Sequence, residues 1–305
     1  MGSLSTANVE FCLDVFKELN SNNIGDNIFF SSLSLLYALS MVLLGARGET
    51  AEQLEKVLHF SHTVDSLKPG FKDSPKCSQA GRIHSEFGVL FSQINQPDSN
   101  CALSIANRLY GTKTMAFHQG KNVTVEMMYQ IGTFKLAFVK EPQMQVLELP
   151  YVNNKLSMII LLPVGTANLK QIEKQLNSGT FHEWTSSSNM MEREVEVHLP
   201  RFKLEIKYEL NSLLKSLGVT DLFNQVKADL SGMSPTKGLY LSRAIHKSYL
   251  DVSEEGTEAA AATGDSIAVK SLPMRAQFKA NHPFLFFIRH THTNTILFCG
   301  KLASP

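Results

Sequence analysis

The chain has 305 residues, 43% of them hydrophobic, and a formal net charge of +1. This length is enough for one large domain or two ordinary ones, and the apolar fraction is enough for a sizeable core. The balanced charge, with no run of five like charges, excludes a global attraction to nucleic acid or to an anionic membrane.

The four cysteines are too few and too scattered for a disulfide framework or a C-x-x-C zinc knuckle; they are Cys12, Cys77, Cys101 and Cys299. The N-terminal stretch lacks the basic region, apolar core and cleavage site of a signal peptide. We therefore expect free thiols and a reducing, cytoplasmic location, where the glycosylation sequon at Asn122 stays unmodified.

Residues 28–45 contain no charged residue, and a run of this length could span a membrane. Four serines dilute the run, and Asp26 and Arg47 at its ends form no basic cluster. These features favour a buried helix over 33–44 that stops at Gly45. The alternative is an uncleaved internal export signal, which would allow unconventional secretion.

The first half of the chain is predicted to be mainly helical. The N-terminus predicts an amphipathic helix, and Thr50 is expected to cap a helix over 51–58, with Gln53 placed as in a capping box. Residues 61–85 are polar and interrupted by Gly and Pro, which predicts a flexible loop. Residues 103–110 predict a strand.

The second half is predicted to be mainly strand. The expected strands cover 133–140, 145–150, 156–163, 194–204, 239–252, 284–290 and 295–300, and the expected helices cover 168–176 and 208–217. The strand over 156–163 is apolar almost throughout, so both of its faces should be covered. With no repeat and no linker, the chain reads as a single α+β domain over 1–305.

No motif for chemistry is present. G-x-S-x-G, H-E-x-x-H, phosphate-binding Gly loops and paired C-x-x-C motifs are all missing, which argues against an enzyme, including a hydrolase built on Ser and His. His290 and His292 could face one metal, but a hairpin turn explains them better, so no metal or cofactor is expected. Acidic residues at the end of a strand more simply solvate that end; they are Asp251, Glu254, Glu255 and Glu258.

The stretch SEEGTEAAAATGDSIAVKSLP, residues 253–273, has almost nothing to bury. One reading is a flexible solvated loop, which invites proteolysis, with Lys270-Ser271 as a cut site for a trypsin-like protease. The other is a strand in a second state, because alternate positions carry only small uncharged side chains, namely Thr257, Ala259, Ala261 and Thr263. Glu258 falls on the opposite face, and Gly256 allows a hinge.

EEGTEAAAAT, residues 254–263, resembles the hinge of the reactive loop in serpins. Other segments match serpins in the same order: residues 27–54, 199–210, 217–223, 246–261 and 282–305. The N-terminal helix, the polar stretch at 61–85 and the final Ser-Pro resemble the ovalbumin-like, mainly intracellular branch, known as clade B.

The resemblance implies a serpin fold, with N-terminal helices, a large mixed sheet, smaller sheets and an exposed reactive loop at about 254–277. Serpins trap serine proteases, because the cleaved loop inserts into the main sheet before the acyl-enzyme is hydrolysed. By this resemblance the reactive bond is Lys270–Ser271, and the partner is a trypsin-like serine protease bound by a monomer. A second bond, Arg275–Ala276, would leave too long an insert. The implied hinge consists of Glu255, Gly256, Thr257, Glu258, Ala259, Ala260, Ala261, Ala262 and Thr263.

The chain departs from the serpin pattern in two places. Ser32 stands where serpins usually carry proline, and the sequence jumps after Gln119 past roughly 85 residues of the family, far beyond ordinary loop variation. The missing block would hold a helix, an outer strand, a crossing helix and a central strand, so it indicates a splice isoform or a gene-model error. An inserted loop would then lose one neighbour, and we expect a poor or non-inhibitory serpin; the alternative is a non-inhibitory binding protein of the same fold.

Overall fold

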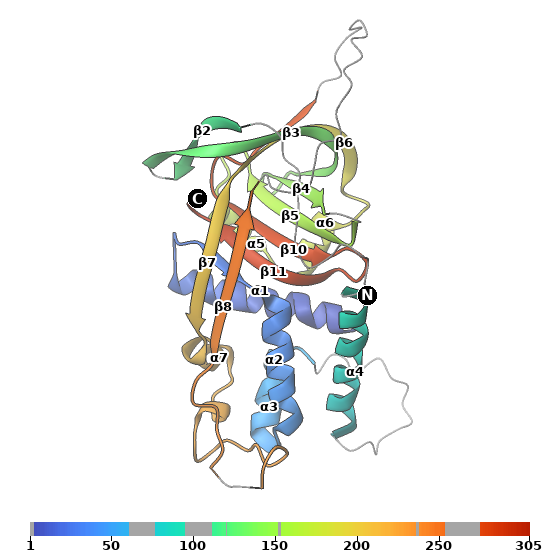
Figure 1. Ribbon diagram of the computed structural model, residues 1–305, viewed down its shortest axis with the longest axis vertical. Helices are drawn as coiled ribbons and strands as arrows, with labels where there is room; N and C mark the ends of the chain where they lie inside the picture. Colours follow the sequence, from blue (N-terminus) through green and yellow to red (C-terminus); the bar gives the residue numbers. More distant parts are fainter. Residues whose placement is uncertain are drawn as a thin grey trace, which may run out of the picture. The chain divides into compact units, whose positions relative to one another are not determined.

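The computed structural model describes residues 3–60, 77–94, 112–119, 121–151, 154–235, 238–253 and 275–305. The chain forms two compact units. The first contains residues 1–101, 205–249 and 287–300, and the second contains residues 102–204, 250–286 and 301–305. The helices and strands are labelled in Figure 1.

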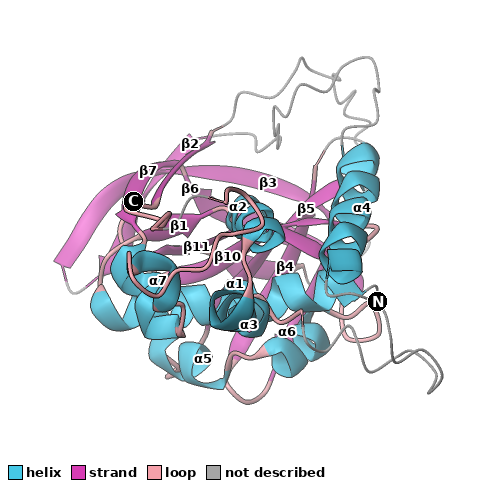
Figure 2. Cartoon of the chain, turned by 90° about the horizontal axis from the view of Figure 1, so that it is seen from below, coloured by secondary structure: helices cyan, strands magenta, loops and turns pink. Residues whose placement is uncertain are grey.

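The helices of the first unit are α1 (Ser3–Asn22), α2 (Ser32–Gly45), α3 (Gly48–Val57), α4 (Cys77–Ile94), α7 (Asn211–Leu217) and the short 3-10 helix η3 (Asp221–Phe223). Helix α2 contacts α1, α3 and α4, and α1 contacts α7 (Figure 2). The predicted N-terminal helix is confirmed. Strand β1 (Ile28–Phe30) precedes α2, and Ser31 caps α2 by accepting a hydrogen bond from the Ser34 amide.

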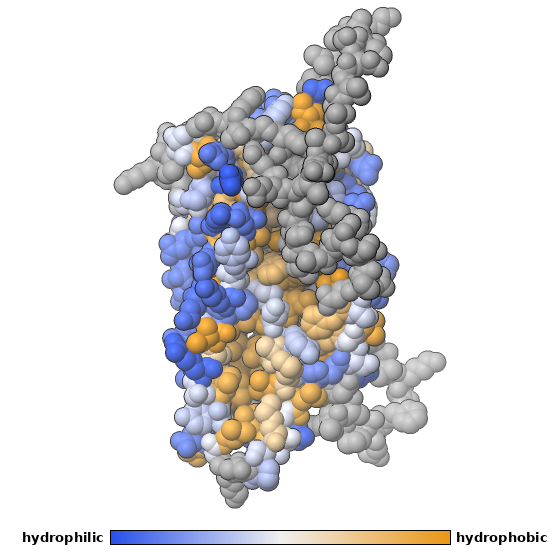
Figure 3. All heavy atoms as spheres, in the orientation of Figure 1, coloured by the Kyte–Doolittle hydropathy of each residue, from blue (hydrophilic) through white to orange (hydrophobic). Residues whose placement is uncertain are grey.

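Helix α2 confirms the predicted apolar helix but is buried on one side only. Leu36 is fully buried, whereas Met41 and Leu44 are 43% and 37% exposed. In the view of Figure 3, hydrophobic side chains gather over α2, and hydrophilic side chains lie beside them. Because the apolar run is divided between β1 and a helix of 14 residues, it does not form one long span. Among the described helices, none is long and apolar enough to cross a membrane.

Two expectations for the first half are wrong. Helix α3 begins at Gly48, so Thr50 lies inside it, where its hydroxyl accepts from the Asp229 amide at 3.0 Å. Gln53 accepts from two amides near η3, so these side chains bind distant backbone and do not cap locally. Residues 77–85, expected in a loop, belong to α4, because Ile83, Phe87 and Leu90 form one buried face at helical spacing. Residues 61–76 and the strand expected over 103–110 lie outside the described residues.

The second unit contains the part β5-β4-β3-β6-β9 of a nine-stranded sheet, and β2 pairs with β3 beside this path. The strands are β2 (Thr112–Gln119), β3 (Lys121–Val139), β4 (Met144–Pro150), β5 (Leu156–Pro163), β6 (Met191–Pro200) and β9 (Ala276–Lys279). The pairings are antiparallel except for the parallel pair β6–β9. The expected double-sided burial of β5 is confirmed, since Met158 to Leu162 are at most 1% exposed. Helices α5 (Leu169–Gln175) and α6 (Ser178–Thr185) complete the unit, and α5 confirms the helix expected over 168–176.

Four strands contain residues of both units: β7 (Phe202–Glu209), β8 (Ile245–Val252), β10 (Phe284–His290) and β11 (Thr295–Leu302). The last two confirm the expected strand pair. The strand expected over 194–204 is instead two strands that break at Arg201, and the helix expected over 208–217 begins only at Asn211, because residues 202–209 continue as β7. Gly218, at φ 117°, ends α7 as expected.

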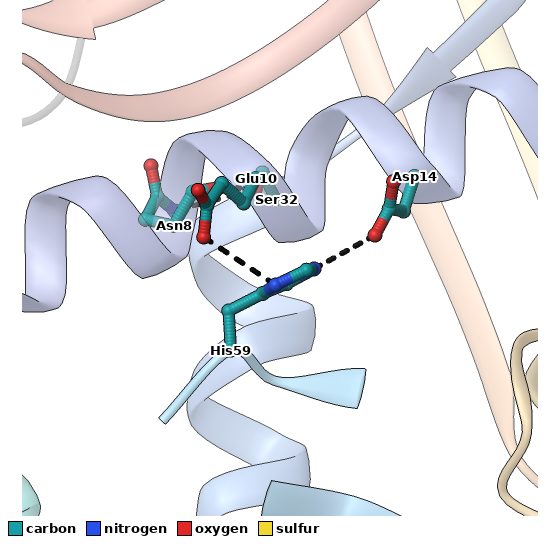
Figure 4. A network of polar contacts seen from close by, with 5 residues as sticks. All are labelled: Asn8, Glu10, Asp14, Ser32 and His59. Carbon is teal, nitrogen blue, oxygen red and sulfur yellow. Dashed lines mark hydrogen bonds and ion pairs between the residues drawn. The ribbon is translucent and has the colours of Figure 1, made fainter. Parts of the chain in front are cut away.

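Helix α1 is fixed to β11 by one buried amide side chain. Asn8 is fully buried, its Oδ1 accepts from the Ile296 amide at 2.7 Å, and its Nδ2 donates to Ser32 Oγ at 3.2 Å. The same helix carries Glu10 and Asp14, and the imidazole of His59 lies between their carboxylates (Figure 4). Its Nδ1 is 3.4 Å from Glu10 Oε2, and its Nε2 is 2.7 Å from Asp14 Oδ2. Because Asn8 is fully buried, solvent cannot take the place of its side chain as the acceptor for the Ile296 amide.

Replacing Asn8 by alanine should therefore lower the free energy of unfolding by about 1–3 kcal/mol, because the Ile296 amide stays buried without an acceptor. Urea denaturation measures this loss. The control is Asn22→Ala at the exposed end of α1, which should change stability by less than about 0.5 kcal/mol. Equal stability of the two variants would contradict the anchoring role of Asn8.

Candidate functional site

The predicted reactive bond and its hinge lie outside the described residues. Lys270, Ser271 and residues 255–263 all fall within 254–274, and so do Glu254, Glu255 and Glu258. The structure does describe both attachment points of this segment, the end of β8 at Val252 and the start of β9 at Ala276. Both attachment points belong to the second unit.

Strand β8 has one charged face and one buried face. Its buried positions alternate with exposed ones, so His246, Ser248, Leu250 and Val252 point inward. On the outer face, ion pairs join β8 to β7. Later residues of β7 pair with earlier residues of β8, so the two strands are antiparallel. These ion pairs are Lys203–Asp251, Glu205–Lys247 and Glu209–Arg243, the last from the residue before β8. Asp251, which was expected to solvate the strand end, instead forms an ion pair with Lys203.

The other edge of β8 has no strand beside it among the described residues. The sheet that contains β8 has two strands, β7 and β8, within the part of the chain that the structure describes. A strand edge without a neighbour presents a row of backbone N–H and C=O groups.

Two polar residues on the inward face of β8 form hydrogen bonds with the backbone of β1 and of the residue that follows it. Nε2 of His246 accepts from the Ser31 amide at 3.0 Å, and the Ser248 hydroxyl donates to the Phe29 carbonyl at 2.7 Å. Burial lowers the pKa of His246, and an acceptor nitrogen is unprotonated, so both observations describe a neutral imidazole. Sequence reasoning missed these contacts, although polar residues at the inward positions of an alternating strand were a visible signal.

A partly buried tyrosine and two buried cysteines lie near this network in the first unit. The hydroxyl of Tyr208 accepts from the Phe29 amide at 3.3 Å, and burial raises the pKa of Tyr208 to about 12. Cys12 and Cys299 are buried free thiols, as expected for these two, and burial raises the pKa of Cys299 well above its usual range. With its pKa raised in this way, the Cys299 thiol stays protonated and unreactive.

Strand β9 fixes the other attachment point. It runs parallel to β6, Phe278 is fully buried, and the Gln277 carbonyl accepts from the Gln145 side chain at 3.0 Å. Arg275, directly before β9, forms an ion pair with Glu194 at 2.8 Å. The second candidate bond, Arg275–Ala276, is therefore held against the sheet.

The two histidines considered as metal ligands lie at a hairpin. Residues 291–294 form the turn between β10 and β11, and Nδ1 of His290 is hydrogen-bonded to the Thr293 hydroxyl at 2.8 Å. Among the described residues, no three His, Cys, Asp or Glu side chains are arranged to bind a metal ion. The hairpin interpretation of His290 is confirmed.

The serpin (serine protease inhibitor) family model matches residues 6–120 and 111–305, so this chain belongs to the serpin family. It is 76% identical to human Serpin B11 over 392 aligned positions and 36% identical to human leukocyte elastase inhibitor over 396, with full coverage of both chains in each comparison. Among solved structures it is similar to uncleaved ovalbumin, with TM-score 0.82, 29% identity and full coverage of both chains. A cleaved, loop-inserted ovalbumin mutant gives TM-score 0.76 at 28% identity, again with full coverage.

These relatives confirm the resemblance to the ovalbumin-like branch, and they are longer than this chain. The comparison with human Serpin B11 runs over 392 positions against 305 residues here, a difference of 87. The family model matches in two parts that overlap at residues 111–120. In the structure, β2 and β3 form an antiparallel hairpin there, with Gln119 paired with Lys121.

The neutral state of His246 predicts a pH dependence of stability. The unfolded chain binds a proton near pH 6.5, whereas the folded chain resists protonation of His246 until a lower pH. The free energy of unfolding should therefore fall as the pH decreases below about 6.5. His246→Gln, which keeps an acceptor but cannot titrate, should show a shallower fall in urea denaturation between about pH 7.5 and 5.5.

Asn22→Gln, at the exposed end of α1, exchanges two side chains that do not titrate, so it is the control and should keep the slope of the unchanged protein. Identical slopes for the His246 variant and the unchanged protein would contradict a neutral, buried His246.

Proposed function

We propose that this serpin presents Lys270–Ser271 to a trypsin-like serine protease, and that this short form is cleaved by the protease without trapping it. The observation that carries the proposal is the single-sided pairing of β8, which has β7 as its strand neighbour in the described part of the chain. By family resemblance, the cleaved loop would insert at the other edge of β8. There it would pair with β8 on one side and find no described strand on its second side.

The energetic consequence is large. A central strand of eight residues, such as 256–263, makes about eight backbone hydrogen bonds on each side. At about 1 kcal/mol net for each bond, loss of one side removes on the order of 8 kcal/mol from the inserted state. This is comparable with the whole stability of a domain, about 5–15 kcal/mol. Insertion would then be too weak to distort a protease before the acyl-enzyme is hydrolysed.

We place the missing positions directly after Gln119. The difference of 87 positions from human Serpin B11 and the overlap of the two family matches at 111–120 both support this point. The β2–β3 hairpin joins the two parts with regular antiparallel pairing from Thr112↔Met128 to Gln119↔Lys121. An alternative splice product would have this organisation.

Lys270 is favoured over Arg275 as the bait. Arg275 is paired with Glu194, and the following residue is already in the β6–β9 pair, so a protease would have to separate β9 from the sheet to reach that bond. A lysine in the primary pocket fits a trypsin-like protease. By family resemblance we place the protein in the cytoplasm as a monomer.

Mixing the full chain with trypsin and boiling in detergent tests this proposal on a gel. We expect a chain clipped after Lys270 and no covalent complex, with the site established by mass spectrometry of the released C-terminal fragment. Lys270→Ala should remove this cut. Human leukocyte elastase inhibitor mixed with leukocyte elastase serves as the positive control for a detergent-resistant complex. A stable complex with the short chain would overturn the proposal.

A second function, a non-inhibitory serpin-fold binding protein, is favoured by the outer face of β8, where Ile245 and Tyr249 are 47% and 58% exposed. Such a protein would act without cleavage, so a partner should bind the Lys270→Ala variant as strongly as the unchanged chain. Binding should weaken by roughly tenfold in Tyr249→Ala, since a central aromatic contact is commonly worth more than about 1 kcal/mol. If no partner depends on Tyr249, this second function fails.

A further inference from the structure

Three side chains of the second unit form a small exposed cluster on β3 and β6. Phe138 is 54% exposed and Met191 is 59% exposed, and the Arg193 guanidinium lies 5.6 Å from the Phe138 ring centroid. Nη2 of Arg193 also lies 3.5 Å from the Met191 sulfur. Phe138, Met191 and Arg193 are called the Phe138 cluster below.

The strand register places this cluster on one face of the sheet. Leu136 is paired with Met191 and Phe134 with Arg193, and Phe138 is two residues further along β3 on the same side. Contacts with Phe138 and Met191 hold the Arg193 side chain over the aromatic ring, so less side-chain entropy would be lost on binding. Arg193 makes no ion pair with a described residue, so its charge can pair with a carboxylate from outside.

Single exposed apolar side chains are common on protein surfaces and need no explanation. This cluster differs in its composition, because aromatic residues, methionine and arginine are the types enriched at protein interfaces. It also differs in its position. Strand β9 runs parallel to β6 with Ala276 opposite Val195, and Arg275 is paired with Glu194, so the start of β9 points towards the Met191 end of β6.

The reach of the chain connects the cluster to the reactive bond. Lys270 precedes Arg275 by five residues, which span at most about 17 Å when fully extended. A protease domain of about 220 residues has a radius of gyration of about 17 Å. A protease that holds Lys270 in its primary pocket is therefore large enough to reach this end of β3 and β6.

We propose that the Phe138 cluster is a secondary contact surface for the protease that attacks Lys270–Ser271. The inference rests on the proposed function and adds a specificity determinant to it. The apolar side chains Phe138 and Met191 would contact an apolar surface loop of the protease, and Arg193 would pair with a carboxylate on it. The partner is thus a trypsin-like protease that carries an acidic, partly apolar loop beside its active-site cleft.

Cleavage kinetics with trypsin test this surface. The double variant Phe138→Ala, Met191→Ala should raise the KM for cleavage after Lys270 by about 5–10-fold and leave kcat unchanged, because it removes uniform binding. Arg193→Glu should raise KM by a similar factor, and added salt should reduce this effect. A synthetic peptide of residues 262–276 should have the same high KM as the double variant, since it lacks the cluster.

Val226→Ala is the matched control, because Val226 is 93% exposed in the first unit and its loss should leave KM unchanged. An unchanged midpoint in urea denaturation shows that a variant is folded. If the double variant is not folded, Arg193→Glu alone provides the test. Cleavage of the double variant and of Arg193→Glu with the KM of the unchanged chain overturns the secondary surface alone. Absence of cleavage after Lys270 in every form overturns the proposed function, and this inference with it.

Discussion

The pairing of β8 with β7 is the interaction on which the properties of this chain depend. β8 leads directly into the segment that carries the predicted hinge, and it is fixed both by ion pairs to β7 on its outer face and by His246 and Ser248 on its inner face. A strand fixed on one edge and one face is stable enough to present a loop. It still offers only half of the hydrogen-bonding positions that an incoming strand needs, because an interior strand is bonded on both edges.

Presentation and trapping therefore depend on different parts of the fold. The attachment of the loop at β9 is complete, since Phe278 is buried, Gln277 accepts from Gln145 and Arg275 is paired with Glu194. None of these contacts involves the region where the chain is shorter than its relatives. Trapping requires in addition a strand on the second edge of β8, and by family resemblance that strand belongs to the missing block. A chain can therefore lose the ability to trap a protease and still present the loop.

Much of this organisation was predictable from the sequence, and the failures have local causes. The strands β4, β5, β10 and β11 follow from alternation or from continuous apolar runs, since burial leaves a direct pattern in the residues. Helix α4 was missed because Gly81 and the polar residues around it hid the buried face formed by Ile83 and Phe87. Thr50 and Gln53 looked like a cap, but backbone amides distant in sequence bind their oxygens. The Phe138 cluster could not be found from sequence, because it depends on the register between two strands.

The exposed apolar side of α2 completes this argument. Met41 and Leu44 remain partly exposed on a helix whose other side is fully packed, so the first unit has a stable core and an incompletely covered face at the same time. An exposed apolar face raises the free energy of the folded state in water without removing the contacts that define the fold. The deletion proposed above would remove a main-sheet strand and the helix that covers it, and this would account both for this face and for the single strand neighbour of β8 among the described residues. Both features would then have the same cause: one edge of β8 has no strand neighbour among the described residues, and Met41 and Leu44 of α2 are partly exposed.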